Sequence, residues 1–242
     1  MLRKWEKGGM MINTGAEFVF ILLTIAAYVI GVFVYRKSKL MLLHSVIVAT
    51  AIVILFFEVT GIDMYHYENN TKVLRYILNL SVVAFGYLLY KNYGIIRKNG
   101  IAILLATFTG SLVSLLSVAA IASIAGVDLS MIITLLPKSI TTPIAIVLTE
   151  KMGGIVYLTA VIVTLAGIFG AVTGPWFLRV IGIKGRLATG LAMGSAAHGI
   201  GTAKALESGA LEGAAGGLAI ALMGVFTSIL LPLIVALLKL VL

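Results

Sequence analysis

The chain has 242 residues, of which 61% are hydrophobic and 11% are charged, and its mean hydropathy is +1.14. Soluble domains are about 45–50% apolar and about 25% charged, so this composition excludes a water-soluble protein and indicates an integral membrane protein. The absence of cysteine excludes disulfides, thiolate catalysis and cysteine-based metal or iron–sulfur sites. The net charge is +9, and the basic residues that give it lie in short loops between apolar segments. This placement is typical of membrane topology and not of nucleic-acid binding.

Six segments are long and apolar enough to cross a bilayer, which takes about 20 residues. In chain order they are 18–35, 40–57, 73–90, 100–125, 155–178 and 213–238. The basic start of the chain lacks the short apolar run and cleavage site of a signal peptide, so we expect the first span to be retained. Two further apolar segments, 129–150 and 187–206, are interrupted by polar stretches that contain proline or glycine. The count is eight spans if both cross the membrane and six if both enter and return.

Charge placement distinguishes these two topologies. The basic clusters at 36–39, 91–98 and 179–186 are expected in the cytoplasm, and the acidic loop at 58–68 is expected outside. A segment 129–150 that returns to its own side satisfies this rule, whereas full crossing would put the last basic cluster outside. The sequence therefore predicts re-entrant hairpins, with the N-terminus outside despite Arg3, Lys4 and Lys7.

The two interrupted segments also belong to an internal repeat. A shift of 57 residues aligns Glu150 with Glu207 and Pro175 with Pro232. A hairpin followed by one span reverses the chain direction each time, so the two units would be inverted, which is a recurrent transporter design. We predict an all-α polytopic membrane protein with about six spans and two re-entrant broken-helix hairpins. It would form a single integral membrane domain, with residues 1–127 as scaffold and dimerisation part and 128–242 carrying the site.

The first interruption has the sequence PKSITTP and runs from Pro137 to Pro143. Thr142 followed by Pro143 has the pattern of an N-cap and a proline in the first helical turn, which predicts a half-helix from Pro143 to about Glu150. The N-terminus of this half-helix would lie near mid-membrane and attract anions. Lys138 either attracts the same anion, or pairs with helix carbonyls or reaches outward to water.

The second interruption, GSAAHGIGTAK, runs from 194 to 204 and predicts a second half-helix N-terminus after His198. With an ordinary pKa of about 6.5, His198 could couple protons to transport or bind substrate, or it could be a buried structural histidine bonded to a carbonyl. Lys204 has the same alternatives as Lys138, and Glu150 and Glu207 are either coupling groups or surface charges at helix ends. Two converging N-termini with several hydroxyls would suit a small hydroxylated or keto carboxylate. The candidate substrate-binding residues are Lys138, Ser139, Thr141, Thr142, Pro143, Ser195, His198, Gly199, Gly201, Thr202 and Lys204, and the coupling candidates are His198, Glu150 and Glu207.

Other patterns point away from enzymatic chemistry. The sequence has no Walker loop and no zinc-type ligand cluster, and no acid is spaced to form a triad with His198 and a serine. We therefore expect no catalytic site, no metal and no cofactor. His44 lies alone on an apolar face and is expected to be structural. Gly190, Gly194 and the glycines at 213–217 form small-residue faces that predict close helix packing.

The same two interruptions resemble the motifs of the LrgB/CidB family. Residues 135–145 read LLPKSITTPIA, similar to the family's LLPKSVTTPIA, and residues 197–205 read AHGIGTAKA, similar to SHGIGTA(R/K)A. The resemblance implies an antiholin-like protein that modulates murein hydrolase export and autolysis with a small LrgA/CidA-type partner. It also implies kinship with pyruvate uptake systems and the plastidial glycolate/glycerate translocator. The N-terminal half departs from the family, with His44-Ser45 in place of Asn-Pro, and with 79–82 and Leu88 in place of a Gly-Pro-Ala-Thr stretch and a proline.

From these observations we expect a proton-coupled transporter of small monocarboxylates such as pyruvate, glycolate or glycerate. We place it as a homodimer in the plasma membrane of a bacterium. The alternative is an antiholin-like regulator of murein hydrolase activity that acts with an LrgA/CidA-type subunit, and a third possibility is a structural subunit for a partner. A holin-like pore is expected to consist of short subunits with few spans, which six spans with internal hairpins fit poorly.

Overall fold

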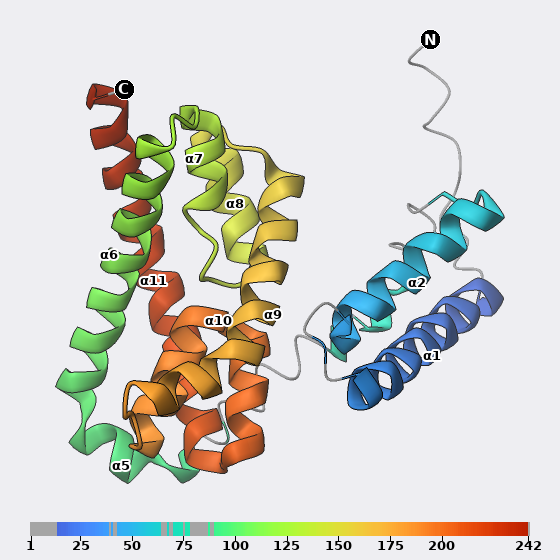
Figure 1. The fold of residues 1–242 in the computed structure, drawn as a ribbon, viewed down its shortest axis with the longest axis horizontal. Coiled ribbons are helices and arrows are strands. Elements are labelled where there is room, and N and C mark those ends of the chain that lie inside the picture. Colours follow the sequence, from blue (N-terminus) through green and yellow to red (C-terminus); the bar gives the residue numbers. More distant parts are fainter. Residues whose placement is uncertain are drawn as a thin grey trace. The chain divides into compact units, whose positions relative to one another are not determined.

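The computed structural model describes residues 14–38, 40, 43–63, 67, 70–74, 76, 77, 87 and 90–241 (Figure 1). Every regular element in these residues is a helix, which confirms the predicted all-α class. The chain divides into two compact units, Met1–Ser81 and Val82–Leu242. Several expectations fall outside the described residues. They concern most of the predicted span 73–90, the family departures at 79–82 and Leu88, and the charges of Arg3, Lys4, Lys7, Lys39 and Glu68.

The first unit contains α1 (Thr14–Ser38) and α2 (Ser45–Thr60). Gly31 lets α1 approach the start of α2 closely, because a side chain there would collide with the Ser45 carbonyl oxygen. Phe20, Phe57 and Tyr67 form an aromatic cluster with ring centroids 5.4–5.8 Å apart. Edge-to-face contacts of this kind stabilise a helix pair beyond simple packing.

The ends of α2 follow from local sequence. His44 is the N-cap, and its Nδ1 accepts a hydrogen bond from the Val46 amide at 3.4 Å. Gly61 ends the helix at φ 67°, a left-handed conformation that glycine adopts without a steric penalty. The cap agrees with the structural role expected for His44.

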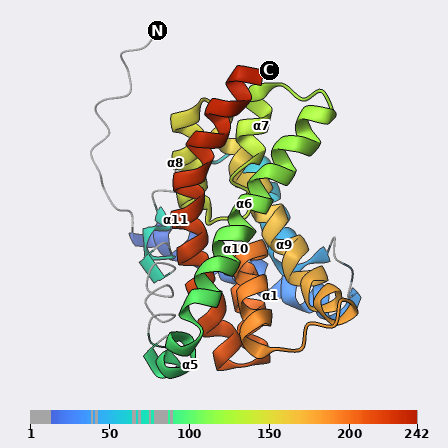
Figure 2. The same ribbon diagram turned by 90° about the vertical axis from the view of Figure 1, so that its left-hand side faces the viewer.

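The second unit contains seven helices among the described residues, and Figures 1 and 2 show α6 and α11 running side by side along its length. The α7–α8 segment occupies one end of this pair and α10 the other, while α9 connects the two ends. In chain order the helices are α5 (Tyr93–Lys98), α6 (Gly100–Ile124), α7 (Leu129–Leu135), α8 (Thr142–Met152), α9 (Val156–Val180), α10 (Arg186–Ser208) and α11 (Ala210–Val241).

The first interrupted segment forms a helical hairpin of α7 and α8. The seven residues of α7 extend only about 10 Å, far less than the roughly 30 Å hydrocarbon core of a bilayer. The chain then reverses, and α8 ends beside the start of α7, where the Ser130 hydroxyl donates to the Gly153 carbonyl at 3.3 Å. The Ile155 amide also donates to the Thr134 hydroxyl at 2.8 Å.

The second interrupted segment forms a hairpin within α10. Ala197 (φ −127°, ψ 16°) and His198 (φ 40°, ψ −127°) depart from helical geometry and divide α10 into two halves. The halves lie against each other, because a side chain at Gly201 would collide with the Met193 carbonyl. Each hairpin is followed by one long helix, and these helices, α9 and α11, run in opposite directions in Figure 1.

Membrane embedding is supported by length and by surface. Among the described residues, four helical stretches are long and apolar enough to cross a bilayer: Glu17–Ser38, Gly100–Ile124, Val156–Val180 and Ala210–Leu240. Ser45–Thr60 is apolar but shorter. Large hydrophobic side chains on the outward faces are exposed, for example Ile124 (87% exposed) and Tyr157 (79%). The chain is therefore a helical membrane protein, whereas the predicted count of six spans exceeds the four found in the described residues.

Hydroxyl groups connect the helices inside the second unit. The Thr149 and Thr159 hydroxyls are 3.0 Å apart, and the Thr159 hydroxyl also donates to the Thr134 carbonyl at 3.0 Å. The Ser111 and Thr227 hydroxyls join α6 to α11 at 2.8 Å. Interhelical hydrogen bonds and close packing hold membrane helices together, because lipid supplies no hydrophobic force between them.

Candidate functional site

The tip of the first hairpin carries a lysine held by hydroxyls. The Lys138 ammonium donates to the Ser139 hydroxyl at 2.9 Å and to the Ser114 hydroxyl of α6 at 3.5 Å. The two serine hydroxyls are 3.0 Å apart. No described carboxylate forms an ion pair with this half-buried lysine. A positive charge that meets only neutral oxygens is suited to an anionic ligand.

Ser114 was not among the residues predicted from the sequence. It lies in the middle of α6, an uncharged and mostly apolar helix that also carries Ser111 and Ser117. Nothing in the order of these serines indicates which one faces the hairpin. The packing of α6 against the tip makes that selection.

The start of α8 differs by one residue from the prediction. The helix begins at Thr142 with Thr141 as N-cap, and the Thr141 side chain makes no capping hydrogen bond. Pro143 is thus the second helical residue, where the missing N–H is still harmless because the first four helical amides have no intrahelical partner. The N-cap position therefore falls on Thr141 and not on the predicted Thr142, and the Thr141 hydroxyl does not cap these amides.

The tip of the second hairpin is organised by His198. Its buried ring places Nε2 2.9 Å from the Val163 carbonyl of α9, which requires the proton to be on Nε2. The ring occupies space left by Gly167, where a Cβ would lie 2.5 Å from Cε1. This carbonyl contact is the one expected of a structural histidine, and the coupling role stays a prediction.

Thr202 carries a buried hydroxyl that has no hydrogen-bond partner in the part of the chain that the structure describes. A helical threonine normally bonds to the carbonyl four residues earlier, which here belongs to His198, where the backbone is not helical. Gly216 of α11 makes room for this side chain, since a Cβ there would lie 2.8 Å from Oγ1. Ser195 is half-buried nearby in sequence, and Gly199 has open space around its Cα.

Three charged candidates lie away from the tips. Lys204 pairs with Glu207 at 2.6 Å on the exposed face of the second half-helix, with side chains 45% and 67% exposed. Exposed pairs of this kind contribute about 0–1 kcal/mol. Glu150 is exposed near the end of α8. The structure therefore does not bring Lys204, Glu207 or Glu150 to the residues at either tip.

Both tips lie about halfway along the second unit. Ser114 at the first tip is central in α6, Gly167 beside His198 is central in α9, and Ile144 of α8 approaches Gly224 in the middle of α11. Val163 connects the tips, because its side chain packs in one core with Leu136 and Ile140 while its carbonyl meets His198.

An ion pair closes the base of the second hairpin. Arg186, the first residue of α10, binds Glu212 of α11 through two hydrogen bonds of 2.7 and 2.9 Å. Glu212 is buried, and bidentate geometry gives such pairs directional specificity. The sequence analysis placed Arg186 in a basic cluster but did not predict its pairing with Glu212. Among the described residues, no three histidine, aspartate or glutamate side chains gather in a group that could hold a metal ion.

Comparison with known proteins places the chain in a family. The model of the LrgB-like family matches residues 24–237. The protein named "Uncharacterized protein YxaC" from Bacillus subtilis (strain 168) is 36% identical over 217 residues, covering 90% of this chain and 94% of the relative. "Holin-like protein CidB" from Staphylococcus epidermidis (strain RP62A) is 32% identical over 219 residues, covering 90% and 96%. "Antiholin-like protein LrgB" from Bacillus cereus (strain B4264) is 30% identical over 224 residues, covering 92% and 97%. No solved structure matches. With a family match that includes both hairpins and relatives aligned over almost their whole length, the chain belongs to the LrgB-like family.

Proposed function

We propose that the protein is a holin- or antiholin-like regulator in a bacterial cell membrane, which controls murein hydrolase activity together with a small LrgA/CidA-type subunit. The observation that carries this proposal is the near-complete alignment with relatives named holin-like CidB and antiholin-like LrgB. These names favour the regulator over the transporter that the sequence patterns put first. None of these names denotes an enzyme.

A second candidate function, translocation of small carboxylates, is favoured by the two hairpin tips. Short half-helices that end halfway along a membrane unit are typical of transporter binding sites. Lys138, whose partners among the described residues are hydroxyls, supplies a positive charge at that level. The two functions are compatible, because autolysis can respond to the balance of carboxylates and protons across the membrane.

Uptake assays separate the two functions. In proteoliposomes with and without the small subunit, labelled pyruvate, glycolate, glycerate and lactate are offered to the wild type and to Lys138→Gln. If the tip binds a carboxylate, Lys138→Gln should lower uptake about tenfold or more, because a hydrogen bond to a charged group contributes about 1.5–3 kcal/mol. Lys184→Gln, in an exposed loop, is the matched control and should leave uptake unchanged.

Detergent-induced autolysis of a deletion strain carrying the same variants completes this test. Complementation by a wild-type protein that transports none of the four acids supports the regulator alone and removes the carboxylate function. Uptake without any effect on autolysis would rule out the regulatory function.

If the protein transports carboxylates, a pH gradient should drive their accumulation, and His198→Gln should bind substrate but accumulate it poorly.

The proposed topology is tested by labelling this cysteine-free chain. We infer that both hairpins are re-entrant, so a cysteine replacing Glu150 should react from outside and one replacing Gly185 from the cytoplasm. Both sites accept a side chain, since Glu150 is exposed and the nearest atom to a Cβ at Gly185 is 3.7 Å away. Ala125→Cys is the control and should react from the same side as Glu150→Cys. Reaction of the Glu150 and Gly185 cysteines from one side would show that segment 129–150 crosses fully.

A further inference from the structure

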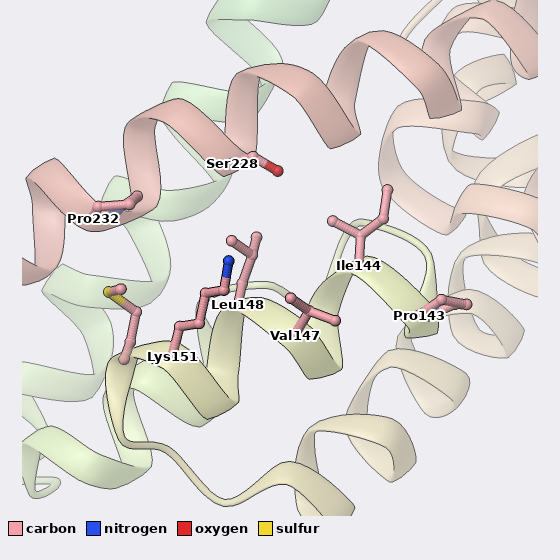
Figure 3. A pocket seen from close by; sticks show the side chains of 8 residues that line it. Pro143, Ile144, Val147, Leu148, Lys151, Ser228 and Pro232 are labelled. Carbon is pink, nitrogen blue, oxygen red and sulfur yellow. The ribbon is translucent and has the colours of Figure 1, made fainter.

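A groove with a volume of about 510 Å³ lies between α8 and α11 (Figure 3). Gly224 of α11 allows the two helices to meet at one end of it, since a Cβ there would lie 2.9 Å from the Ile144 side chain. Most of its wall is apolar and consists of Pro143, Ile144, Val147, Leu148, Met152 and Pro232. The groove shares Pro143 with the candidate substrate residues, but neither Lys138 nor His198 lines it.

The length of the groove corresponds to one leaflet of a bilayer. Its wall follows α8 from Pro143 to Met152, ten residues whose nine steps rise about 14 Å along the helix axis. The hydrocarbon core of a bilayer is about 30 Å thick, so half of it is about 15 Å. Since α8 begins halfway along the unit, the groove extends from mid-depth toward one membrane surface.

A single positive charge lies in the groove near the surface end. Figure 3 shows the Lys151 ammonium directed into the space between α8 and α11. None of the lining residues is acidic. The Ser228 hydroxyl donates a hydrogen bond to the Gly224 carbonyl oxygen at 2.7 Å. An apolar groove with a cation near its surface end matches an amphiphile that has an anionic head and a hydrocarbon tail.

We propose that this groove binds one acyl chain of an anionic phospholipid, with the lipid phosphate on Lys151. Lysine at the membrane surface attracts anionic lipids, and its long aliphatic stem allows the ammonium to reach the headgroups. This lipid site does not depend on which proposed function is correct.

Native mass spectrometry of the full chain in detergent tests the lipid site. The protein is titrated with phosphatidylglycerol or with phosphatidylcholine of the same acyl chains. The wild type should bind one phosphatidylglycerol in preference to phosphatidylcholine, and Lys151→Gln should weaken phosphatidylglycerol binding about fivefold, which corresponds to about 1 kcal/mol. Val147→Phe, which narrows the groove at an exposed position, should lower the binding of both lipids.

Lys184→Gln, on an exposed loop after α9, is the matched control and should bind lipid like the wild type. Circular dichroism confirms that each variant is folded. Equal phosphatidylglycerol binding by Lys151→Gln and Lys184→Gln would overturn the proposal. So would a Val147→Phe variant that binds lipid normally but loses self-association in cross-linking, because a second copy of the chain would then occupy the groove.

Discussion

Gly194→Ala should strongly destabilise the second unit. A Cβ at this position would collide with the Gly216 carbonyl oxygen and lie 2.7 Å from the Gly216 Cα. These are backbone atoms of α11, so relief requires the two helices to separate and not merely a side chain to rotate. Overpacking of this kind costs about 1–3 kcal/mol or more, and we expect a clear fall in the thermal unfolding temperature in detergent.

The control for this substitution lies in the same helix. A Cβ at Gly199 would have no atom within 4 Å, so Gly199→Ala adds a methyl group without a clash. Gly190 and Gly201 resemble Gly194, because a Cβ at either would collide with a backbone carbonyl. Equal unfolding temperatures for Gly194→Ala and Gly199→Ala would show that α10 and α11 are not in backbone contact.

His198→Gly should be more stable than His198→Ala, by about 1–3 kcal/mol. Both substitutions remove the ring and its contact with Val163, so the difference between them reports the backbone alone. At φ 40° and ψ −127°, His198 adopts a conformation that glycine accepts and other residues reach only with strain of about 1–3 kcal/mol. In a regular helix the order is reversed, since alanine exceeds glycine by about 1 kcal/mol.

The sign of this difference therefore distinguishes a broken α10 from a continuous one. Chemical unfolding of the two variants in mixed micelles, compared with Ala192→Gly in the first half of α10, provides the measurement. Ala192→Gly should show the ordinary helical penalty for glycine. A His198→Ala variant more stable than His198→Gly would mean that the chain does not reverse at this residue.

Local sequence determined the position of both hairpins. Threonine at 141 suits an N-cap and Pro143 suits the first turn of a helix, and α8 starts within one residue of the predicted place. The family motif around His198 likewise coincides with the break in α10. Helix-breaking and capping preferences act over three or four residues, so they can be read without any knowledge of the fold.

Tertiary structure decided which side chains meet. The helices of the second unit are apolar on nearly all sides, so their periodicity does not indicate a buried face. The sequence alone therefore could not pair Lys138 with Ser114 or His198 with the Val163 carbonyl, and it left Lys204 as a site candidate although Glu207 neutralises it at the surface. Each of these contacts depends on how one helix is rotated and shifted against another. Close packing at small residues fixes this rotation and shift, and only the folded chain brings those residues together.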